Sequence, residues 1–265
     1  MLPDRGPPGG SVFDSLASAG YAAATAGCAA TEESIPNVLI TGANRGLGLE
    51  FARQYAGSGW RVWAACRAPD KADRLEALAG RSRGRVTLHR LDVGDRVHIE
   101  TLAGALGDEA VDVLLNNAGV SGNDGRGFGE VNDDSWVATL RVNTIAPMKI
   151  AEAFVEPVAR SDRRVIACLS SRMGSIADNT SGGNYIYRSS KAALNAVVRS
   201  LAHDLRARGV IAVALHPGWV ATDMGGPNAP LKPSESIAGL RAVIDRLDPA
   251  DSGKFLNYDG TQIPW

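Results

Sequence analysis

From about residue 36 onward, short apolar runs alternate with longer stretches in which apolar residues recur every three or four positions. The short runs have the length of strands and predict them at Val38–Thr41, Arg61–Ala65, Val86–Leu91, Val111–Leu115, Val165–Leu169, Val210–Leu215 and Lys254–Tyr258. The longer stretches predict helices at Gly46–Gly57, Asp70–Leu78, Val97–Leu106, Asp133–Val158, Tyr187–Arg208 and Ser234–Leu247. Pro147 lies inside the longest of these, where it would either kink the helix or sit in its middle.

This alternation of strands and helices predicts a parallel sheet with helices on both faces. The strands are almost continuously apolar, which is typical of strands buried on both sides. We therefore predict an α/β fold with a single Rossmann-type, doubly wound parallel sheet. Ligands of such sheets bind beyond the carboxyl ends of the strands, so chemical motifs should follow directly after strands.

The first 36 residues have a different character from the rest of the chain. Pro3, Pro7, Pro8 and the neighbouring glycines disfavour both helix and strand. The Ala-rich stretch Leu16–Ala30, the longest apolar stretch without a charge, is too short to span a bilayer. We predict a flexible extension over residues 1–36 and one folded domain over residues 37–265.

Composition excludes several classes of protein. The formal net charge of −1 gives no basic excess of the kind that nucleic-acid binders carry. Of the three cysteines, Cys66 and Cys168 lie in apolar strand runs, so they are expected to pack in the core rather than form disulfides. No cysteine and histidine cluster has the spacing of metal ligands. We predict a cytoplasmic protein with no metal and no nucleic-acid or membrane partner.

The first predicted strand runs directly into the sequence TGANRGLG, residues 41–48. Glycines allow a tight turn and let the backbone approach a pyrophosphate, and the following helix start offers free N–H groups at its positive end. The spacing of Gly42, Gly46 and Gly48 differs from the common G-x-G-x-x-G pattern. Its position between a strand and a helix nevertheless indicates a dinucleotide site.

Four motifs in order resemble the short-chain dehydrogenase/reductase family. TGANRGLG is similar to the family's TGxxxGxG turn, and three further segments match its NNAG, YxxxK and PG motifs: Asn116–Gly119, Tyr187–Lys191 and Pro217–Gly218. The resemblance extends from about Ile35 to the last residue and implies an NADP-binding domain. The cofactor-binding residues that it implies are Gly42, Asn44, Arg45, Gly46, Leu47, Gly48, Arg67, Asp92, Val93, Asn117, Ala118, Gly119, Tyr187, Lys191, Pro217, Gly218, Val220 and Thr222.

The end of the second strand favours NADPH/NADP+ over NAD. An acidic residue at this position would bind the ribose 2′-hydroxyl of NAD, whereas arginine suits the 2′-phosphate of NADP. The strand ends at Cys66 and Arg67 with no acid, and Arg45 in the glycine turn could reach the same phosphate. The other interpretation is that Arg45 and Arg67 are ordinary surface residues.

Tyr187 and Lys191 are four residues apart, which places them on one face of a helix. A nearby ammonium group favours phenolate and is expected to lower the pKa of Tyr187. In the mechanism that the family resemblance implies, Tyr187 gives a proton to the carbonyl oxygen as hydride arrives from the nicotinamide, and it acts as base in the reverse direction. Lys191 would also hold the ribose hydroxyls of the cofactor.

The resemblance implies two further catalytic residues. Ser171, the second serine of the segment Ser170–Ser175, would help to hold the substrate oxygen, although its distance of 16 residues from Tyr187 is longer than is usual in the family. Ser175 is therefore a rival, whereas Ser170 should point the other way, because side chains alternate along a strand. Asn143 matches the family residue that anchors a water in the proton supply.

The enlarged loop before Tyr187 and the two segments HPGWVATDMGG and KFLNYDGTQIPW resemble the C-factor and sniffer-like carbonyl reductases. This resemblance implies reduction of small-molecule carbonyls or quinones. The alternatives are a cofactor-binding signalling or scaffold protein of the same fold, or another reaction such as epimerisation, for which the chain leaves little room. The long helices around Asn143 and Tyr187 pair two subunits in many family members, which would make a homodimer, whereas some carbonyl reductase relatives stay monomeric.

Overall fold

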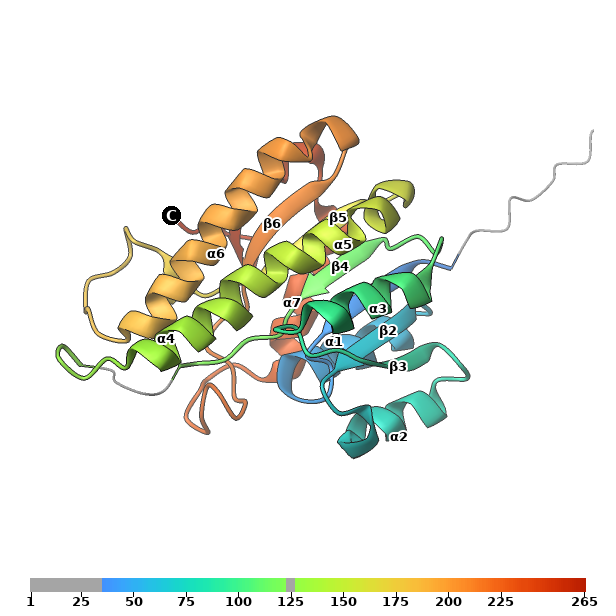
Figure 1. The fold of residues 1–265 in the computed structure, drawn as a ribbon, viewed down its shortest axis with the longest axis horizontal. Coiled ribbons are helices and arrows are strands. Elements are labelled where there is room, and N and C mark those ends of the chain that lie inside the picture. Colours follow the sequence, from blue (N-terminus) through green and yellow to red (C-terminus); the bar gives the residue numbers. More distant parts are fainter. Residues whose placement is uncertain (1–34, 123–126) are drawn as a thin grey trace, which may run out of the picture. The chain divides into compact units, whose positions relative to one another are not determined.

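Seven parallel strands form one sheet, with the spatial order β3-β2-β1-β4-β5-β6-β7 (Figure 1). The computed structural model describes residues 35–122 and 127–265, so nearly all of the predicted extension lies outside the described residues. The strands are β1 (Asn37–Thr41), β2 (Arg61–Cys66), β3 (Val86–Arg90), β4 (Val113–Asn116), β5 (Val165–Leu169), β6 (Ile211–His216) and β7 (Phe255–Asn257). The predicted fold class, a doubly wound parallel sheet, is confirmed.

Helices cover both faces of this sheet. The α-helices are α1 (Gly46–Gly57), α2 (Asp73–Arg81), α3 (Arg96–Leu106), α4 (Asp133–Leu140), α5 (Ala146–Arg160), α6 (Tyr185–Asp204) and α7 (Pro233–Arg246). Because side chains alternate along a strand, β1 sends Val38 and Ile40 to one core and Leu39 to the other. The first core is closed by α1, α2 and α7, and the second by α3, α5 and α6. Within the described residues, no helix is long and apolar enough to cross a membrane.

Three of the predicted helices are interrupted. The predicted helix Tyr187–Arg208 is α6 followed by a 3₁₀ turn, η4 (Arg206–Arg208). The predicted helix Asp70–Leu78 is a 3₁₀ turn, η1 (Pro69–Lys71), followed by α2. The predicted helix Asp133–Val158 consists of α4, a π-helical turn η2 (Arg141–Ile145), and α5. Pro147 stands in the first turn of α5, and a proline ring clashes with the carbonyl four residues earlier, here that of Asn143. The wider π turn accommodates this carbonyl, so the helix changes its winding at Asn143 rather than at the proline.

The order of the strands determines where a ligand can bind. β1 lies between β2 and β4, so the chain leaves β1 toward one face and enters β4 from the other. Connections therefore diverge beyond the carboxyl ends of β1 and β4 and leave a crevice there. The glycine turn follows β1, Arg67 follows β2, and Asn117 follows β4, so the predicted motifs meet at this edge.

Candidate active site

A cleft of about 690 Å³ opens at this edge of the sheet. Most of the predicted cofactor residues line it: Gly42, Asn44, Arg45, Gly46, Leu47, Gly48, Arg67, Asp92, Val93, Asn117, Ala118, Gly119, Tyr187, Lys191, Pro217 and Thr222. Gly218 and Val220 do not line it. Gly218 faces Leu231 and Tyr258, and Val220 is buried in a β-bridge with Leu231, so both shape the loop that carries Thr222.

The glycine turn needs each of its glycines for a different reason. Gly42 and Gly46 have φ angles of 67° and 53°, which only glycine adopts without strain. At Gly48 a side chain would collide with the carbonyl of Gly42 and with the amide of Asn117. The turn therefore brings bare backbone and the start of α1 to the wall of the cleft, as an anionic ligand requires.

Hydrogen bonds tie the ends of β1 and β4 together beneath this turn. The Thr41 hydroxyl donates to the Leu115 carbonyl (3.3 Å) and accepts from the backbone N–H groups of Asn117 and Ala118, both at 3.0 Å. The Asn117 side chain donates back to the carbonyls of Thr41 (2.8 Å) and Gly42 (3.2 Å). The glycine turn and the NNAG segment thus form one rigid wall.

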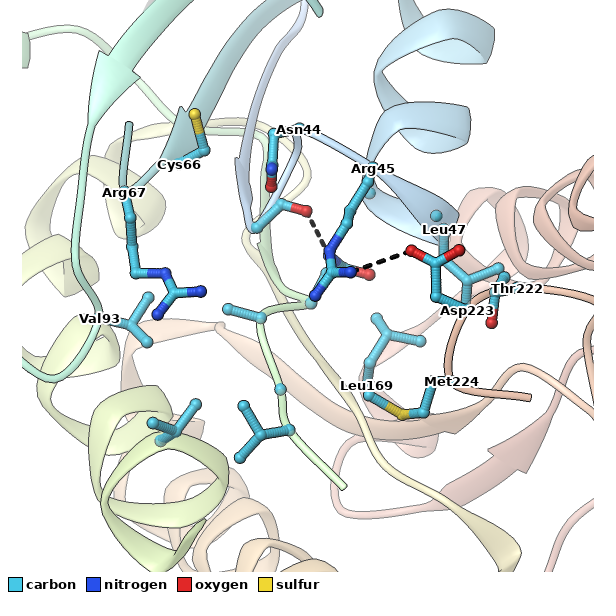
Figure 2. A pocket seen from close by; sticks show the side chains of 18 of the residues that line it. Asn44, Arg45, Leu47, Cys66, Arg67, Val93, Leu169, Thr222, Asp223 and Met224 are labelled. Carbon is cyan, nitrogen blue, oxygen red and sulfur yellow. Dashed lines mark hydrogen bonds and ion pairs between the residues drawn. The ribbon is translucent and has the colours of Figure 1, made fainter. Parts of the chain in front are cut away.

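Three cations stand at the end of the cleft near β2: Arg45, Arg67 and Lys71. Figure 2 shows Arg45 between Arg67 on one side and Asp223 on the other. Arg45 forms an ion pair with Asp223 (2.9 Å), and the two side chains are 66% and 79% exposed. In residues 35–122 and 127–265, no acidic side chain lies within ion-pair distance of Arg67 or Lys71, so this end of the cleft carries uncompensated positive charge.

Sequence reasoning missed Lys71 and Asp223 as cleft residues. Lys71 follows Arg67 by four positions in the same connection, which is a signal that could have found it. Asp223 adjoins Thr222, but nothing in the sequence links it to the glycine turn. Their pairing depends on how the loop after β6 folds back over the cleft.

Tyr187 stands at the opposite end of the cleft, in the first turn of α6. Burial raises the pKa of its hydroxyl, and a hydrogen bond with the Ser171 side chain opposes part of that rise. Burial dominates, so the pKa of Tyr187 is raised on balance and the expected net lowering is wrong in its direction. Lys191 Nζ lies 5.9 Å from the centre of the Tyr187 ring, and it points instead to the Leu169 carbonyl.

Lys191 is buried with its ammonium group, being only 5% exposed. Its Nζ donates to the carbonyl of Leu169 at 2.7 Å. Burial lowers the pKa of Lys191 to about 8, because the charged form has lost most of its water. A perturbed lysine in a cleft beside a tyrosine is a strong sign of a functional site.

Asn143 is completely buried at the centre of the π turn η2. Its side chain accepts from the Val120 N–H (2.9 Å) and donates to the Val120 carbonyl (2.8 Å) and to the Ser190 hydroxyl (3.0 Å). These bonds connect the segment after β4 to α6, one residue from Lys191. Single π turns inside α-helices are often found at functional sites.

The structure separates the three serines that follow β5. Ser171 contacts Tyr187, and its Oγ also accepts from the Met173 N–H at 3.2 Å. Ser170 points away, as expected, and donates to the buried Asn195 Oδ1 at 2.6 Å. Ser175 is buried and bonds to the Trp265 carbonyl (3.4 Å) and the Asp178 N–H (3.1 Å). Ser171 is the serine that interacts with Tyr187, although Ser170 and not Ser171 is among the residues that line the cleft.

Asn195 is a further buried residue that the sequence analysis did not single out. Its amide accepts from Ser170 and donates to the Gly174 carbonyl (3.2 Å), so it bonds to both sides of the turn that carries Ser171. Asn195 follows Lys191 by four positions on α6, and this spacing is a signal that could have identified it.

Comparisons with known proteins agree with this geometry. A family model described as short chain dehydrogenase matches residues 36–231. "C-signal" of Myxococcus xanthus is 48% identical over 155 residues, which are 58% of this chain and 93% of that protein. The structure of the carbonyl reductase Sniffer of D. melanogaster superposes with a TM-score of 0.81 at 35% identity, over 87% of this chain and 100% of that one.

A second solved structure, an NADPH-bound carbonyl reductase from chicken fatty liver, superposes with a TM-score of 0.80 at 33% identity and covers 87% of this chain and 99% of that one. The family model spans more than half of the chain, and both structures extend over nearly all of the described fold. The chain therefore belongs to the short-chain dehydrogenase family, whose members are oxidoreductases.

Proposed function

We propose that this chain is an NADPH-dependent carbonyl reductase that acts on small-molecule carbonyls or quinones. The observation that carries the proposal is a cleft with Tyr187 and Lys191 at one end and Arg45 and Arg67 at the other, with the Ser171 side chain beside Tyr187. The first end has the groups needed to protonate a carbonyl oxygen, and the second has the charge needed to hold a phosphate.

The cleft fits the nicotinamide cofactor. Gly42, Gly46 and Gly48 leave backbone where a side chain would otherwise block the pyrophosphate. Guanidinium groups form charge-assisted and often bidentate bonds with phosphate, so the exposed side chains of Arg45 and Arg67 suit a 2′-phosphate. The cofactor named for the chicken carbonyl reductase structure, NADPH, supports the same choice.

When bound, NADPH supplies the hydride that reduces the carbonyl carbon. Tyr187 gives the proton to the carbonyl oxygen, and its raised pKa keeps it protonated at neutral pH, as a general acid for reduction requires. Ser171 orients the same oxygen, because its hydroxyl lies beside that of Tyr187. Lys191 stabilises the developing phenolate by its charge, and Asn143 fixes the segment after β4 that faces Lys191.

The exposed apolar residues of the cleft favour an apolar substrate. Val120 and Met224 line the cleft, and both leave a large part of their side chains exposed. Binding sites for small organic molecules are mostly apolar with a few placed polar groups. We therefore expect aromatic or aliphatic ketones, aldehydes and quinones rather than charged sugars or acyl phosphates.

The test is the oxidation of NADPH, and separately NADH, with a panel of aldehydes, ketones and quinones. We expect NADPH to be consumed faster than NADH and Tyr187→Phe to lower kcat by about 10² to 10⁴ fold. Tyr185→Phe is the matched control, because Tyr185 lies two residues earlier on α6 and does not line the cleft. Equal rates for Tyr187→Phe and the wild type would contradict the proposal.

A signalling or scaffold role is the second candidate, and the similarity to "C-signal" favours it. Such a role needs cofactor binding at most. This chain also buries the Lys191 ammonium group, which lowers the stability of the fold, and holds Ser171 against Tyr187, and neither feature is needed for signalling alone. Tight NADPH binding without reduction of any carbonyl would favour this second candidate.

A further inference from the structure

A short 3₁₀ turn, η3 (Arg172–Gly174), directly follows Ser171, the serine beside Tyr187. Ser171 is bonded to this turn twice: its carbonyl accepts from the Gly174 N–H at 2.7 Å, and its Oγ accepts from the Met173 N–H at 3.2 Å. Because the oxygen already accepts one N–H, the hydroxyl proton of Ser171 is available for donation toward Tyr187 or a substrate oxygen. The direction in which this proton points therefore depends on how the turn is held.

The helix α6 holds both sides of the turn with one side chain, Asn195, which is only 4% exposed. Its Oδ1 accepts from the Ser170 hydroxyl at 2.6 Å, and its Nδ2 donates to the Gly174 carbonyl at 3.2 Å. Together with the bond between the Gly174 N–H and the Ser171 carbonyl, these contacts close a ring of bonds that contains Ser171. A side-chain amide suits this position, because it accepts and donates at the same time.

The turn also lies in close contact with α6 one helical turn before Asn195. A Cβ at Gly174 would lie 2.7 Å from the carbonyl carbon of Lys191. The Lys191 Nζ donates to the carbonyl of Leu169 (2.7 Å), a residue that lines the cleft (Figure 2). Lys191 and Asn195 are four residues apart and lie on one face of the helix, so successive turns of α6 hold the chain before and after Ser171.

We propose that Asn195 is a positioning residue that holds the Ser171 hydroxyl against Tyr187. The inference deepens the proposed reductase function and rests on it. Asn195 does not line the cleft, and it acts on the reaction through its bonds to Ser170 and Gly174. Without its amide, the buried Ser170 hydroxyl and the Gly174 carbonyl would lose these partners. An unpaired buried polar group destabilises the conformation that buries it, so the turn would shift and Ser171 with it.

The first measurement is a double-mutant cycle between Asn195→Ala and Ser171→Ala, in kcat/KM for the carbonyl of the panel that the wild type reduces fastest. In the wild-type background Asn195→Ala should lower kcat/KM by roughly tenfold, because the Ser171 hydroxyl loses its orientation. In the Ser171→Ala background the same change should have almost no effect, because the group that it positions is gone. A merely structural role would give the same factor in both backgrounds.

The second measurement is hydrogen exchange of the Met173 and Gly174 amides, whose N–H groups bond to Ser171. Asn195→Ala should accelerate exchange at both amides several-fold, because the turn then opens more often. The Val165 N–H is the internal reference. It bonds to the Asp112 carbonyl (3.1 Å) at the start of β5, and its exchange should stay the same.

Two further variants keep the test decisive. Asn37→Ala is the matched control: Asn37 is 7% exposed, and its amide donates to the Ala110 carbonyl (2.8 Å) at the amino end of β1, whereas the cleft lies at the carboxyl ends. This variant should lower thermal stability and leave kcat/KM unchanged. If Asn195→Ala does not fold, Ser170→Ala removes the bond to Asn195 from the other side. It should show the same coupling to Ser171→Ala with a smaller effect.

Equal factors for Asn195→Ala in both backgrounds, or unchanged exchange at Met173 and Gly174, would overturn the inference. A wild type that reduces no carbonyl at all would instead refute the proposed reductase. Faster exchange at Met173 in Asn195→Ala would then still support the positioning of Ser171 by Asn195. The two failures are therefore distinguishable, because hydrogen exchange needs no catalytic activity.

Discussion

The two ends of the cleft carry positive charge in opposite ways. At the end near β2, Arg45, Arg67 and Lys71 extend from loops and a 3₁₀ turn, and Arg45 is two-thirds exposed. At the end near Tyr187, Lys191 is buried in a long helix, donates to a backbone carbonyl and has a pKa of about 8. An exposed charged side chain changes the free energy of folding little, so replacing it has a modest effect on stability. A buried charge lowers the stability of the fold, so we expect it only where its position is needed for another purpose. Cofactor preference and catalysis should therefore respond very differently to mutation.

The largest expected effect is that of Lys191→Met, which removes the buried charge but keeps the volume. We expect kcat to fall by about 100-fold or more, because the phenolate of Tyr187 loses its nearest cation. Stability should rise at the same time. Since the pKa of Lys191 is about 8 in the fold and 10.5 ordinarily, the buried ammonium costs up to about 3 kcal/mol at neutral pH. Thermal unfolding and steady-state kinetics measure the two changes, and a variant that is both inactive and less stable would contradict this account.

The pH dependence sharpens the same point. Reduction needs Tyr187 protonated and Lys191 charged, and both conditions are lost as the pH rises. The pKa of Tyr187 is raised, so Lys191 deprotonates first, and kcat/KM for reduction should decline as the pH rises through about 8. The wild type should also gain stability between about pH 8 and 10.5, where the unfolded chain binds the additional proton. A rate that stays constant to pH 10 would show that the charge of Lys191 is not needed.

At the exposed end, Arg67→Gln should weaken NADPH binding by roughly tenfold and leave NADH binding unchanged, because only the 2′-phosphate contacts would be lost. Fluorescence titration with both cofactors gives the comparison. Arg61→Gln is the matched control: Arg61 begins the same strand β2, but it pairs with Glu109 (2.9 Å) rather than lining the cleft. Equal loss of NADPH and NADH affinity in Arg67→Gln would contradict a phosphate-specific role.

The smallest expected effect is that of Asp223→Asn. The Asp223 carboxylate competes with a phosphate for Arg45, so its neutralisation should tighten NADPH binding. An exposed ion pair contributes less than about 1 kcal/mol, which limits the gain to roughly fivefold, and salt should reduce it further. Titrations at low and high ionic strength measure the gain. Asp245→Asn is the control, since Asp245 pairs with Arg163 (3.0 Å) elsewhere on the surface, and weaker NADPH binding in Asp223→Asn would contradict the competition.

Local pattern was enough to predict the sheet and most of the cleft. The bounds of α1 and β5 agree with the predicted Gly46–Gly57 and Val165–Leu169, because glycines and polar turns mark their ends clearly. The residues of the glycine turn could be predicted because a chain reversal beside a phosphate restricts the backbone to few residue types.

Contacts between distant segments could not be predicted in this way. The pairing of Arg45 with Asp223 and the bonds of Trp265 to residues 175–177 join residues far apart in the chain. The spacing of apolar and polar residues within a segment does not predict such contacts. The direction of the Tyr187 pKa shift was also predicted wrongly. The spacing of Tyr187 and Lys191 predicts that they lie close together. It predicts neither how deeply Tyr187 is buried nor that Lys191 donates its hydrogen bond to the Leu169 carbonyl.

The π turn at Asn143 has a consequence for how this sequence can change in length. A residue in an α-helix rotates about 100° around the axis relative to its predecessor, and the π turn holds one residue more than an α turn would. Deleting one residue between 141 and 145 would remove this wider turn, and the Pro147 ring would then clash with the carbonyl four residues before it. The Asn143 amide would then rotate away from Val120 and Ser190, although every remaining residue would be unchanged. In this part of the chain the number of residues thus determines the hydrogen bonds of Asn143 as much as their identity does.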